Sequence, residues 1–453
     1  MFKRIIAAAC LPLALIMLVT GFSPVSKEKQ EKLNKETEEN TQKDFVPVFR
    51  FAVATDVHIN AEDNTTTERF KKLFESAYRY SDSHPSYNSL DALVLTGDNC
   101  DNGADAEYEI LKSVLSEYKR DETEFVAVLG NHEFHETGRE GFVRNLNMDL
   151  EPHVVIKGYH FIGLSPNPSD TWQMPSQLIW MSRELKKAEK DDPEKPIFTM
   201  QHGHIWNTVY VSKSWSTQAS LPLHLIYSKY PQVINFSGHS HGPVNNPKSI
   251  WQNSYTQVGA GTLNFFEMER DIGDNTIPEG SRNAAQYLIV EVDAENRVRI
   301  MPYNILTDDF MKTAATTDDP EKQLIWQIEN PSDPSTYAYT SARKKVATAP
   351  WFGENDEAAA EEIGADKVTL TFPQANSDEC VYGYRINIAA KDSPRKKITK
   401  EVYSEYYFEP MPETLSVTVE GLKAGKEYTA EIIPLDVWLQ TGEPLLVSFT
   451  TPD

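Results

Sequence analysis

Five short segments carry most of the side chains that could bind a metal ion, and each follows an apolar run. They are Asp56-Val57-His58, Gly97-Asp98-Asn99-Cys100-Asp101, Gly130-Asn131-His132-Glu133, His202-Gly203-His204 and Gly238-His239-Ser240-His241. Imidazole, carboxylate and amide ligands suit Mn²⁺, Fe or Zn²⁺ rather than Ca²⁺ or a soft-metal cluster. Two such metal ions, bridged by a carboxylate, can bind a phosphate group, make hydroxide at neutral pH and stabilise a leaving oxygen. The residue types therefore predict hydrolytic chemistry at two adjacent metal ions.

The apolar runs before these segments have the composition of buried strands, being short and partly β-branched. They are Phe51–Thr55, Ala92–Thr96, Phe125–Leu129, Ile197–Met200 and Val233–Phe236. Between them the pattern predicts helices over residues 67–80, 104–119 and 176–189. Strand, polar loop and helix in repetition are typical of an α/β layered fold, whose site lies at the carboxyl ends of the strands. Five distant loops can then meet at one place.

The ordered series D-x-H, G-D-x-x-D, G-N-H-E, a His after a strand, and G-H-x-H resembles the calcineurin-like metallophosphoesterase superfamily over about residues 48–305. A single motif of this kind is common by chance, whereas five in family order are not. The resemblance implies a fold of two mixed β-sheets packed as a sandwich and flanked by helices.

The resemblance also implies a role for each motif residue. The first metal would be bound by Asp56, His58 and His241. The second would be bound by Asn131, His202 and His239, with Asp98 bridging both ions. His132 would protonate the leaving group, and Asp101 would orient the His132 ring.

The fourth segment departs from the family pattern because it lacks the usual proline. His202 follows its strand most directly and is taken as the metal ligand. His204, Trp206 and His135 are candidates for substrate contact, with ordinary packing or a surface position as the alternative. Asp101 stands where purple acid phosphatases carry a tyrosine ligand, so a purple di-ferric centre is not expected.

The N-terminal segment predicts the compartment. Lys3 and Arg4 precede an apolar run over residues 5–19, which is typical of a secretory signal peptide and short for a spanning helix. Residues 1–26 are therefore a signal peptide or an uncleaved membrane anchor, and the protein is expected to be secreted or at the cell surface. Residues 27–46 form a charged linker, expected as a solvated tether with a short amphipathic helix as the alternative.

Composition fits an exported enzyme. The 453 residues include 44 basic and 67 acidic side chains, which give a net charge of −23. This balance argues against a nucleic-acid-binding surface. Cys100 and Cys380 fall in different predicted domains, so a disulfide framework is not expected.

We predict a catalytic domain over residues 47–306, a connector over 307–364 and a β-sandwich over 365–453. The sandwich strands are expected at 367–372, 381–389, 402–408, 415–419, 427–434 and 445–451. The segment from Gly421 to Tyr428 resembles the turn and tyrosine corner of fibronectin type III domains. Such a module would space the enzyme or dock it on a cell-wall or surface partner, so a chain ending near Gly364 is expected to stay active on small substrates.

Together these observations predict a secreted dinuclear-metal phosphoesterase acting on phosphate esters, leaning to phosphodiesters or broad substrates. The preference for diesters rests on the lack of a basic cluster near the motifs that could bind a dianionic monoester. A phosphomonoesterase with the same metal core is the alternative. A non-catalytic surface-binding or adhesion protein that keeps the fold as a scaffold is a third hypothesis, against which the complete ligand set argues.

Overall fold

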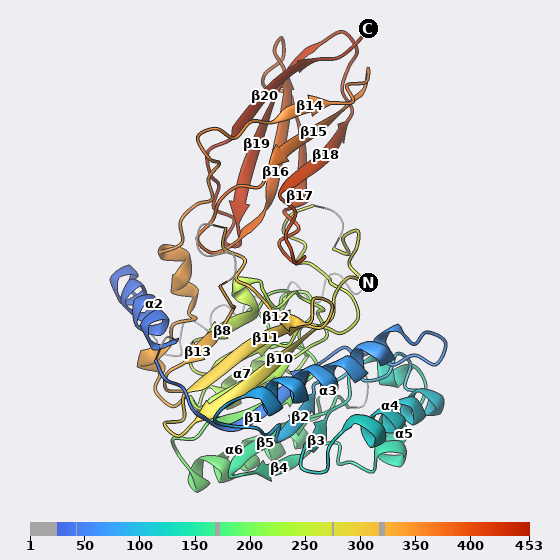
Figure 1. The fold of residues 1–453 in the computed structure, drawn as a ribbon, viewed down its shortest axis with the longest axis vertical. Coiled ribbons are helices and arrows are strands. Elements are labelled where there is room, and N and C mark those ends of the chain that lie inside the picture. The colour runs from blue at the N-terminus through green and yellow to red at the C-terminus, as the bar shows by residue number, and fades with distance from the viewer. Residues whose placement is uncertain (1–24, 42, 168–172, 274–275, 317–321) are drawn as a thin grey trace.

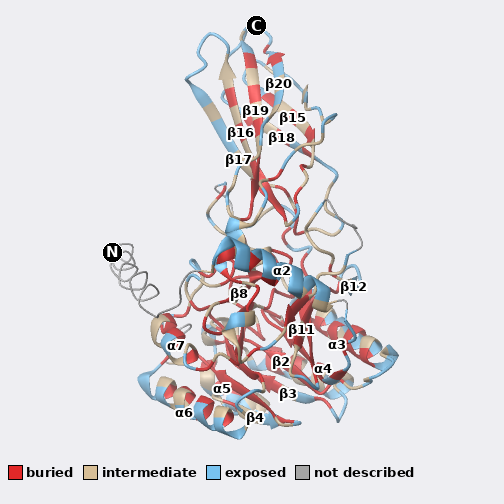
Figure 2. Ribbon diagram, turned by 90° about the vertical axis from the view of Figure 1, so that its left-hand side faces the viewer, coloured by how far each residue is buried: buried red, intermediate tan, exposed pale blue. Residues whose placement is uncertain are grey.

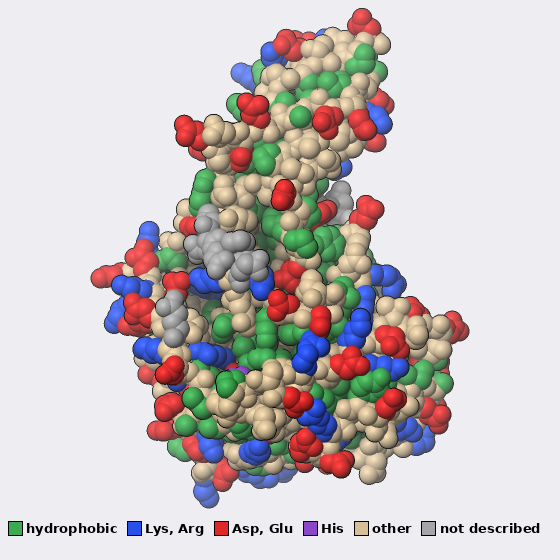
Figure 3. Space-filling model, viewed as in Figure 1, with side chains coloured by type: hydrophobic (Ala, Val, Ile, Leu, Met, Phe, Trp, Pro, Cys, Tyr) green, Lys and Arg blue, Asp and Glu red, His purple; other side chains and the backbone are tan. Residues whose placement is uncertain are grey.

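The computed structural model describes residues 25–41, 43–167, 173–273, 276–316 and 322–453. The expected signal peptide or anchor therefore lies almost entirely outside the described residues. Among those described, no helix combines the length and apolarity that crossing a bilayer requires. On the face drawn in Figure 3, acidic and basic side chains are interspersed over the described surface.

The first sheet of the larger domain has seven strands and contains the first three motif strands side by side. Its strands are β1 Pro47–Ala54, β2 Ala92–Leu95, β3 Glu124–Ala127, β10 Gln286–Asp293, β11 Val298–Asn304, β12 Asp309–Phe310 and β13 Trp326–Ile328. The order is β12-β11-β10-β1-β2-β3, with β13 paired to β11. β1, β2 and β3 run parallel, with Val53, Val94 and Val126 in register. Their motif loops therefore leave the sheet at one edge.

The second sheet has six strands in the order β4-β5-β6-β7-β9-β8 and carries the other two motifs. They are β4 His153–Ile156, β5 Tyr159–Leu164, β6 Ile197–Gln201, β7 Val233–Ser237, β8 Ile250–Gln252 and β9 Thr256–Gly259. β5, β6, β7 and β9 are parallel, whereas β4 and β8 are antiparallel edge strands. Both sheets are thus mixed, as predicted.

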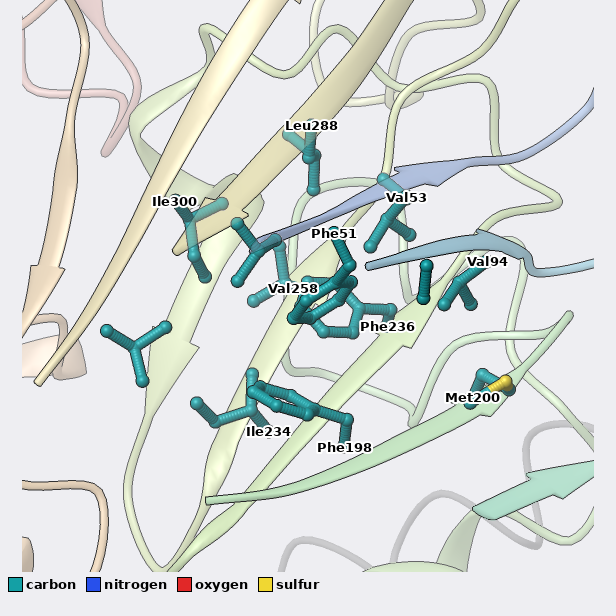
Figure 4. Close-up of a cluster of buried hydrophobic side chains, with 14 of the residues drawn as sticks. Phe51, Val53, Val94, Phe198, Met200, Ile234, Phe236, Val258, Leu288 and Ile300 are labelled. Atoms are coloured by element: carbon teal, nitrogen blue, oxygen red, sulfur yellow. The ribbon is translucent and has the colours of Figure 1, made fainter. Parts of the chain in front are cut away.

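The two sheets pack face to face through aromatic and aliphatic side chains (Figure 4). The ring of Phe51 on β1 lies 4.6 Å, centroid to centroid, from Phe198 on β6, in an edge-on arrangement. Both side chains are fully buried. Truncation of such a side chain costs about 3–5 kcal/mol. This core fixes the sheets against each other, and with them the ends of β1 and β6 that lead into motif loops.

Helices flank the sandwich (Figure 1). They are α3 Thr65–Ser83, α4 Asp105–Tyr118, α5 Gly138–Leu146, α6 Pro175–Asp191 and α7 Ser220–Tyr227. The three helices predicted from the sequence correspond to α3, α4 and α6, each within a few residues. Short 3₁₀ turns occur at η2 His132–His135, η3 Pro247–Ser249, η4 Pro334–Thr336 and η5 Ser341–Lys345. The predicted α/β sandwich with flanking helices is confirmed.

The C-terminal part is all β, in two sheets that enclose their own core. One sheet contains β14 Ala359–Glu361, β15 Lys367–Pro373 and β18 Thr414–Glu420, and the other contains β16 Val381–Ala390, β17 Lys397–Tyr403, β19 Glu427–Asp436 and β20 Leu445–Thr450. Buried and more exposed residues alternate along β15 and β18, as on strands with one wet face. In the predicted corner, the main-chain N–H of Lys423 donates to the Tyr428 hydroxyl over 2.8 Å.

One predicted strand is displaced. The strand expected over residues 402–408 lies at β17, Lys397–Tyr403, where it pairs with β16 from Gly383 to Ala389. Residues after Tyr403 leave the sheet, and Tyr406 and Tyr407 are buried against the larger domain instead. Their apolar composition is typical of a strand, but these side chains are buried in the contact between the two domains.

The expected solvated tether is wrong over residues 27–41, which form helix α2, Lys27–Thr41. Gln30 is fully buried: its amide donates to the carbonyl of Ala338 over 2.6 Å and accepts from the Thr340 hydroxyl over 2.6 Å. Leu33 is buried beside it. Lys–Glu pairs one turn apart occur along the helix, much of which is exposed (Figure 2). One buried amide with two distant partners thus docks a helix that is almost wholly polar.

A buried cluster joins the C-terminal module to the larger domain. It comprises Tyr210, Val211, Phe266, Met268, Ile272, Ala284, Cys380, Tyr382, Tyr406, Tyr407, Leu435 and Val437. In the connector, Trp326 is buried as part of β13, whereas Trp351 is 38% exposed. The module therefore shares apolar packing with the domain on which it sits (Figure 1).

Candidate metal centre

Three side chains from the first and fifth motifs converge at one end of the sandwich. Asp56, His58 and His241 offer ligand atoms that all lie within 4.8 Å of one another. Nε2 of His241 is 3.3 Å from Oδ1 of Asp56 and 3.4 Å from Nε2 of His58. All three side chains are buried. One cation at this point would have two imidazoles and a carboxylate within reach.

A second group lies beside the first. Asp98, His202 and His239 also place their ligand atoms within 4.8 Å of one another. Nε2 of His202 is 3.1 Å from Oδ2 of Asp98 and 3.0 Å from Oδ1 of Asn131. The loop after β3 thereby adds a neutral amide oxygen to two imidazoles and a carboxylate.

Asp98 faces both groups. Its Oδ2 lies 3.1 Å from Nε2 of His202 and 3.8 Å from Nε2 of His58. Its Oδ1 accepts a hydrogen bond from the main-chain N–H of His132 over 2.9 Å, which fixes the carboxylate plane. The geometry is that of a carboxylate shared by two sites.

The outward nitrogens of two rings are held by main-chain carbonyls. Nδ1–H of His202 donates to the carbonyl of Thr96 over 3.0 Å, and Nδ1–H of His241 donates to that of Phe265 over 2.9 Å. Fixing the proton on Nδ1 leaves the lone pair of Nε2 directed at the centre. Metal-binding histidines are commonly oriented in this way.

The charged side chains of the centre shift one another's pKa values. Burial alone would raise the pKa of Asp98, but the rings of His202 and His58 hold it well below its usual range. Burial would lower the pKa of His202, yet Asp98 raises it to about 9. Burial lowers the pKa of His239 and of His241, which favours their neutral forms. Asp98 is therefore ionised and His239 and His241 are neutral, which are the donor forms that a divalent cation needs, whereas His202 has to lose a proton when a metal binds.

Glu133 organises the loops, a role that the sequence analysis did not assign. Its carboxylate is fully buried and accepts from the main-chain N–H groups of Asn99 (2.6 Å), Cys100 (3.1 Å) and Gly130 (2.8 Å). It thereby ties the loop after β2 to the loop after β3. Its position next to His132 in the G-N-H-E motif is the sequence feature that could have indicated this role.

The backbone of the centre is strained. Five of the candidate ligands have positive φ angles: Asp56 (49°), His58 (50°), Asp98 (49°), His239 (70°) and His241 (51°). Such conformations are uncommon outside glycine and cluster at functional sites. Gly130 allows the close approach of two loops, because a Cβ there would lie 2.1 Å from Oδ1 of Asp98.

Asp101 contacts two histidine rings. Its carboxylate Oδ1 lies 3.1 Å from Nδ1 of His58, and its Oδ2 accepts from the amide of Asn60 over 2.9 Å. The His132 ring is instead held by the main-chain carbonyl of Asp101, 2.7 Å from Nδ1, while the carboxylate is 3.8 Å from that atom. Asp101 therefore contacts the His132 ring through its main chain, and its carboxylate lies closer to His58.

His132 itself lies at the edge of the centre. It is partly exposed, and its Nε2 is 4.0 Å from Oδ2 of Asp98. Its ring packs edge-on against His58, with centroids 4.4 Å apart. His132 therefore reaches the candidate ligands while keeping access to solvent.

The three candidates for substrate contact lie in different environments. His204 is buried between the hydroxyls of Ser237 (2.6 Å from Nδ1) and Ser240 (2.7 Å from Nε2), a position that favours the packing alternative, and its contact with substrate stays a prediction. Both serine hydroxyls satisfy its ring nitrogens there. His135 lies beside the centre, 4.7 Å from the His132 ring. Trp206 is half-buried, and its main-chain N–H donates to Ser220.

Two aromatic side chains that the sequence did not single out pack on the candidate ligands. Trp215 stands edge-on to His239 with ring centroids 4.8 Å apart, and Phe265 stacks on His241 at 4.1 Å. They restrict the orientation of these imidazoles. Both lie in loops outside the five motifs, so no local pattern marked them.

Comparison with known proteins gives one family match and several structural similarities. Residues 49–243 match the family model described as calcineurin-like phosphoesterase. No curated protein matches the chain. A purple acid phosphatase from seeds of yellow lupin (Lupinus luteus) is similar in structure, with 13% identity, a TM-score of 0.43 and coverage of 59% of this chain and 53% of that one.

Other solved structures are similar over a smaller share of the chain. The fn3 domain of the human collagen alpha-1(XX) chain is 11% identical, with a TM-score of 0.18 and coverage of 23% of this chain and 87% of that one. A myokine structure is 21% identical, with a TM-score of 0.18 and coverage of 23% and 98%. Similarities this low support no inference about function.

Proposed function

Because residues 49–243 match the calcineurin-like phosphoesterase family model, we propose that this chain hydrolyses phosphate esters at a centre of two metal ions. The observation that supports this most directly is the position of Asp98 between two groups of histidines. A shared carboxylate offsets the repulsion between two cations held about 3.5–4 Å apart. The donor set fits Mn²⁺, Fe or Zn²⁺.

The assignment of ligands follows the two groups. The residues for the first ion are Asp56, His58, His241 and Asp98. The residues for the second are Asp98, Asn131, His202 and His239. Two such ions, when bound, supply an activated water and stabilise negative charge on the phosphoryl oxygens.

The protein's own contribution to the chemistry centres on His132. Its Nδ1–H is held by the carbonyl of Asp101, so Nε2 is the atom that exchanges a proton. The protonated, cationic ring gives the Nε2 proton to the leaving oxygen and becomes neutral, with Nδ1–H still bonded to the carbonyl of Asp101. Edge-on packing against His58 keeps the ring plane in place. This is general acid catalysis by a positioned imidazole.

We propose phosphodiesters or a broad range of esters as substrates, in preference to dianionic monoesters alone. Arg69, which reaches the loop before Phe265, donates to the carbonyls of Leu263, Asn264, Arg282 and Ala284. Its guanidinium is thus committed to the backbone and is not free to clamp a second phosphate charge. A phosphomonoesterase is the alternative. The hypothesis of a non-catalytic binding scaffold does not explain why two groups of metal-binding side chains lie side by side.

We further place the enzyme outside the cytoplasm. This rests on the signal-like composition of residues 1–26, of which 1–24 lie outside the described part of the chain. If that segment is not cleaved, it would be the route to a membrane. The C-terminal module is then the candidate for contact with a cell-wall or surface partner.

The test is hydrolysis of bis(4-nitrophenyl) phosphate and of 4-nitrophenyl phosphate by the full chain. Chelated protein should be inactive, and Mn²⁺, Zn²⁺ or Fe²⁺ added back should restore turnover. A faster rate on the diester would support the lean to diesters, and a faster rate on the monoester would favour the alternative. If neither ester is cleaved at any metal loading, the scaffold hypothesis gains and the enzymatic proposal fails.

A further inference from the structure

A pocket of about 700 Å³ lies between the larger domain and the C-terminal module. Its walls come from residues 207–213 and 248–253, from 269–271, from η5 and from the turn at 437–439. None of the candidate metal ligands lines it. The catalytic proposal therefore leaves this pocket unexplained.

The pocket is basic in a chain that is strongly acidic. Five cationic side chains line it, namely Lys213, Lys248, Arg270, Arg343 and Lys344. Two carboxylates also line it, but each already accepts a hydrogen bond. The Tyr382 hydroxyl donates to Asp271 over 2.5 Å, and the Ser214 hydroxyl donates to Glu269 over 3.1 Å. The surplus is positive although the chain carries a net charge of −23.

Lys248 is the central cation. Its ammonium lies 5.5 Å from the ring centroid of Tyr210 and 5.6 Å from that of Tyr382, within reach of cation–π attraction. Among the described residues its side chain has no hydrogen-bond acceptor and no ion-pair partner. Burial lowers its pKa, since desolvation disfavours the charged form. The carboxylates of Asp271 and Glu269 attract the ammonium from the pocket wall without contacting it, so an anionic ligand that did contact it would supply the missing acceptor.

The other cations are one side chain held by hydrogen bonds and three exposed side chains at the rim of the pocket. Arg343 donates to the carbonyls of Pro247 and Ile250, so it braces the wall. Lys213, Arg270 and Lys344 are exposed and, among the described residues, form no ion pair. They surround the pocket with positive charge that would attract an anion before it reaches Lys248.

Two tryptophans supply apolar surface. Trp251 and Trp438 both line the pocket and are half-buried. The indole N–H of Trp438 donates to Glu379 over 2.9 Å, which fixes the ring. Aromatic faces beside cations suit a ligand that joins a ring to an anionic group. A flat base or a sugar ring can pack on an indole while its phosphate meets the ammonium groups.

From these features we propose that the pocket binds a phosphate monoester attached to a ring, the chemistry shared by a nucleotide and a sugar phosphate. The site is separate from the metal centre and does not depend on the proposed hydrolysis. Lys248 binds the phosphate, the rim cations raise its local concentration, and the tryptophans contact the ring.

Calorimetric titration of the full chain tests this. The chain would carry Asp98→Ala, so that the metal centre contributes no phosphate binding. The probes are AMP, ribose 5-phosphate and adenosine. One or both phosphates should bind, more weakly as ionic strength rises, and adenosine should bind at least tenfold more weakly than AMP. Tighter AMP would identify a nucleotide site, and equal affinities a sugar phosphate site. Absence of binding by both phosphates, or equal binding of AMP and adenosine, overturns the proposal.

Variants locate the site. Lys248→Met should weaken the phosphate probes roughly tenfold, the scale of one charge-assisted hydrogen bond. If that variant does not fold, the exposed pair Lys213→Gln with Lys344→Gln serves instead and should weaken binding severalfold. Lys186→Gln with Lys229→Gln removes the same charge elsewhere on the surface and should leave affinity unchanged. Equal effects of the two double variants would show a general charge effect and refute the pocket.

Discussion

Oδ1 of Asp101 lies 3.1 Å from Nδ1 of His58, whereas the ring of His132 is held by the main-chain carbonyl of Asp101 at 2.7 Å. One residue thus serves two rings by two different groups. The side chain acts on a candidate metal ligand, and the main chain acts on the candidate acid. Substitution of the side chain should separate the two functions.

Asp101→Ala should therefore weaken metal binding rather than proton transfer. Loss of a carboxylate behind a ligating histidine typically lowers metal affinity 10–100-fold. Turnover measured against metal concentration should shift to higher metal and recover most of its maximum at saturation. If saturating metal restores nothing, Asp101 orients His132 after all. Asp149→Ala removes an exposed carboxylate and serves as the control.

His132→Ala should keep both metals and lose turnover by about 10²–10⁴, the usual value of a positioned acid. The loss should be small for a nitrophenolate leaving group, which scarcely needs a proton, and large for an alkyl alcohol. Paired rates on nitrophenyl and alkyl esters, with metal content measured on the same samples, check this. A uniform loss over both leaving groups would argue that His132 has another role.

Asp98→Asn should have the largest effect on metal content, because Asp98 faces both groups of ligands. The amide keeps the shape but removes the charge that offsets two cations. We expect elemental analysis of Mn²⁺-supplemented protein to fall from up to two ions per chain to one or none. Asp149→Asn is the matched control. Full occupancy in Asp98→Asn would contradict a bridging carboxylate.

A chain that ends at Gly364 should lose stability, contrary to the separable module expected from the sequence. The cut would expose Tyr210, Phe266 and Met268, which are now buried against the module. It would also remove the 2.9 Å hydrogen bond between the hydroxyls of Tyr210 and Tyr382. Soluble yield and urea unfolding measure the effect, with Leu446→Ser, at an exposed position, as the control. A truncated chain as stable and active as the full chain would restore the simpler division into domains.

Acid should weaken one ion pair network on α6. Burial would raise the pKa of Glu184, but hydrogen bonds from Lys187, His153 and Arg183 lower it to about 2. A depressed carboxylate pKa adds stability above about pH 4.5 that is lost as pH falls towards 2. Glu184→Gln should therefore be destabilising at pH 7 and nearly neutral near pH 2. Urea midpoints at several pH values, with Glu189→Gln as the control, would reveal a pH-independent loss if this is wrong.

Much of the fold could be predicted because its determinants are local. Buried β-branched runs marked the motif strands, and their parallel pairing brought five loops to one edge of the sandwich. The ligand assignments themselves stay predictions, although the structure brings all seven side chains together. The features that could not be predicted depend on contacts between residues far apart in the sequence. Gln30 docks α2 through residues more than 300 positions away, and Asp101 chooses between two rings only in three dimensions.

The positive φ angles at five candidate ligands have a consequence for anyone who would improve this protein. Each such residue costs on the order of 1 kcal/mol or more relative to glycine, and together they amount to a large share of a typical folding free energy. A selection for heat resistance alone would favour glycine at these positions. Variants with glycine at these positions would be more stable but would lack the metal ligands and therefore the activity. Activity therefore has to be measured alongside stability from the first round of selection.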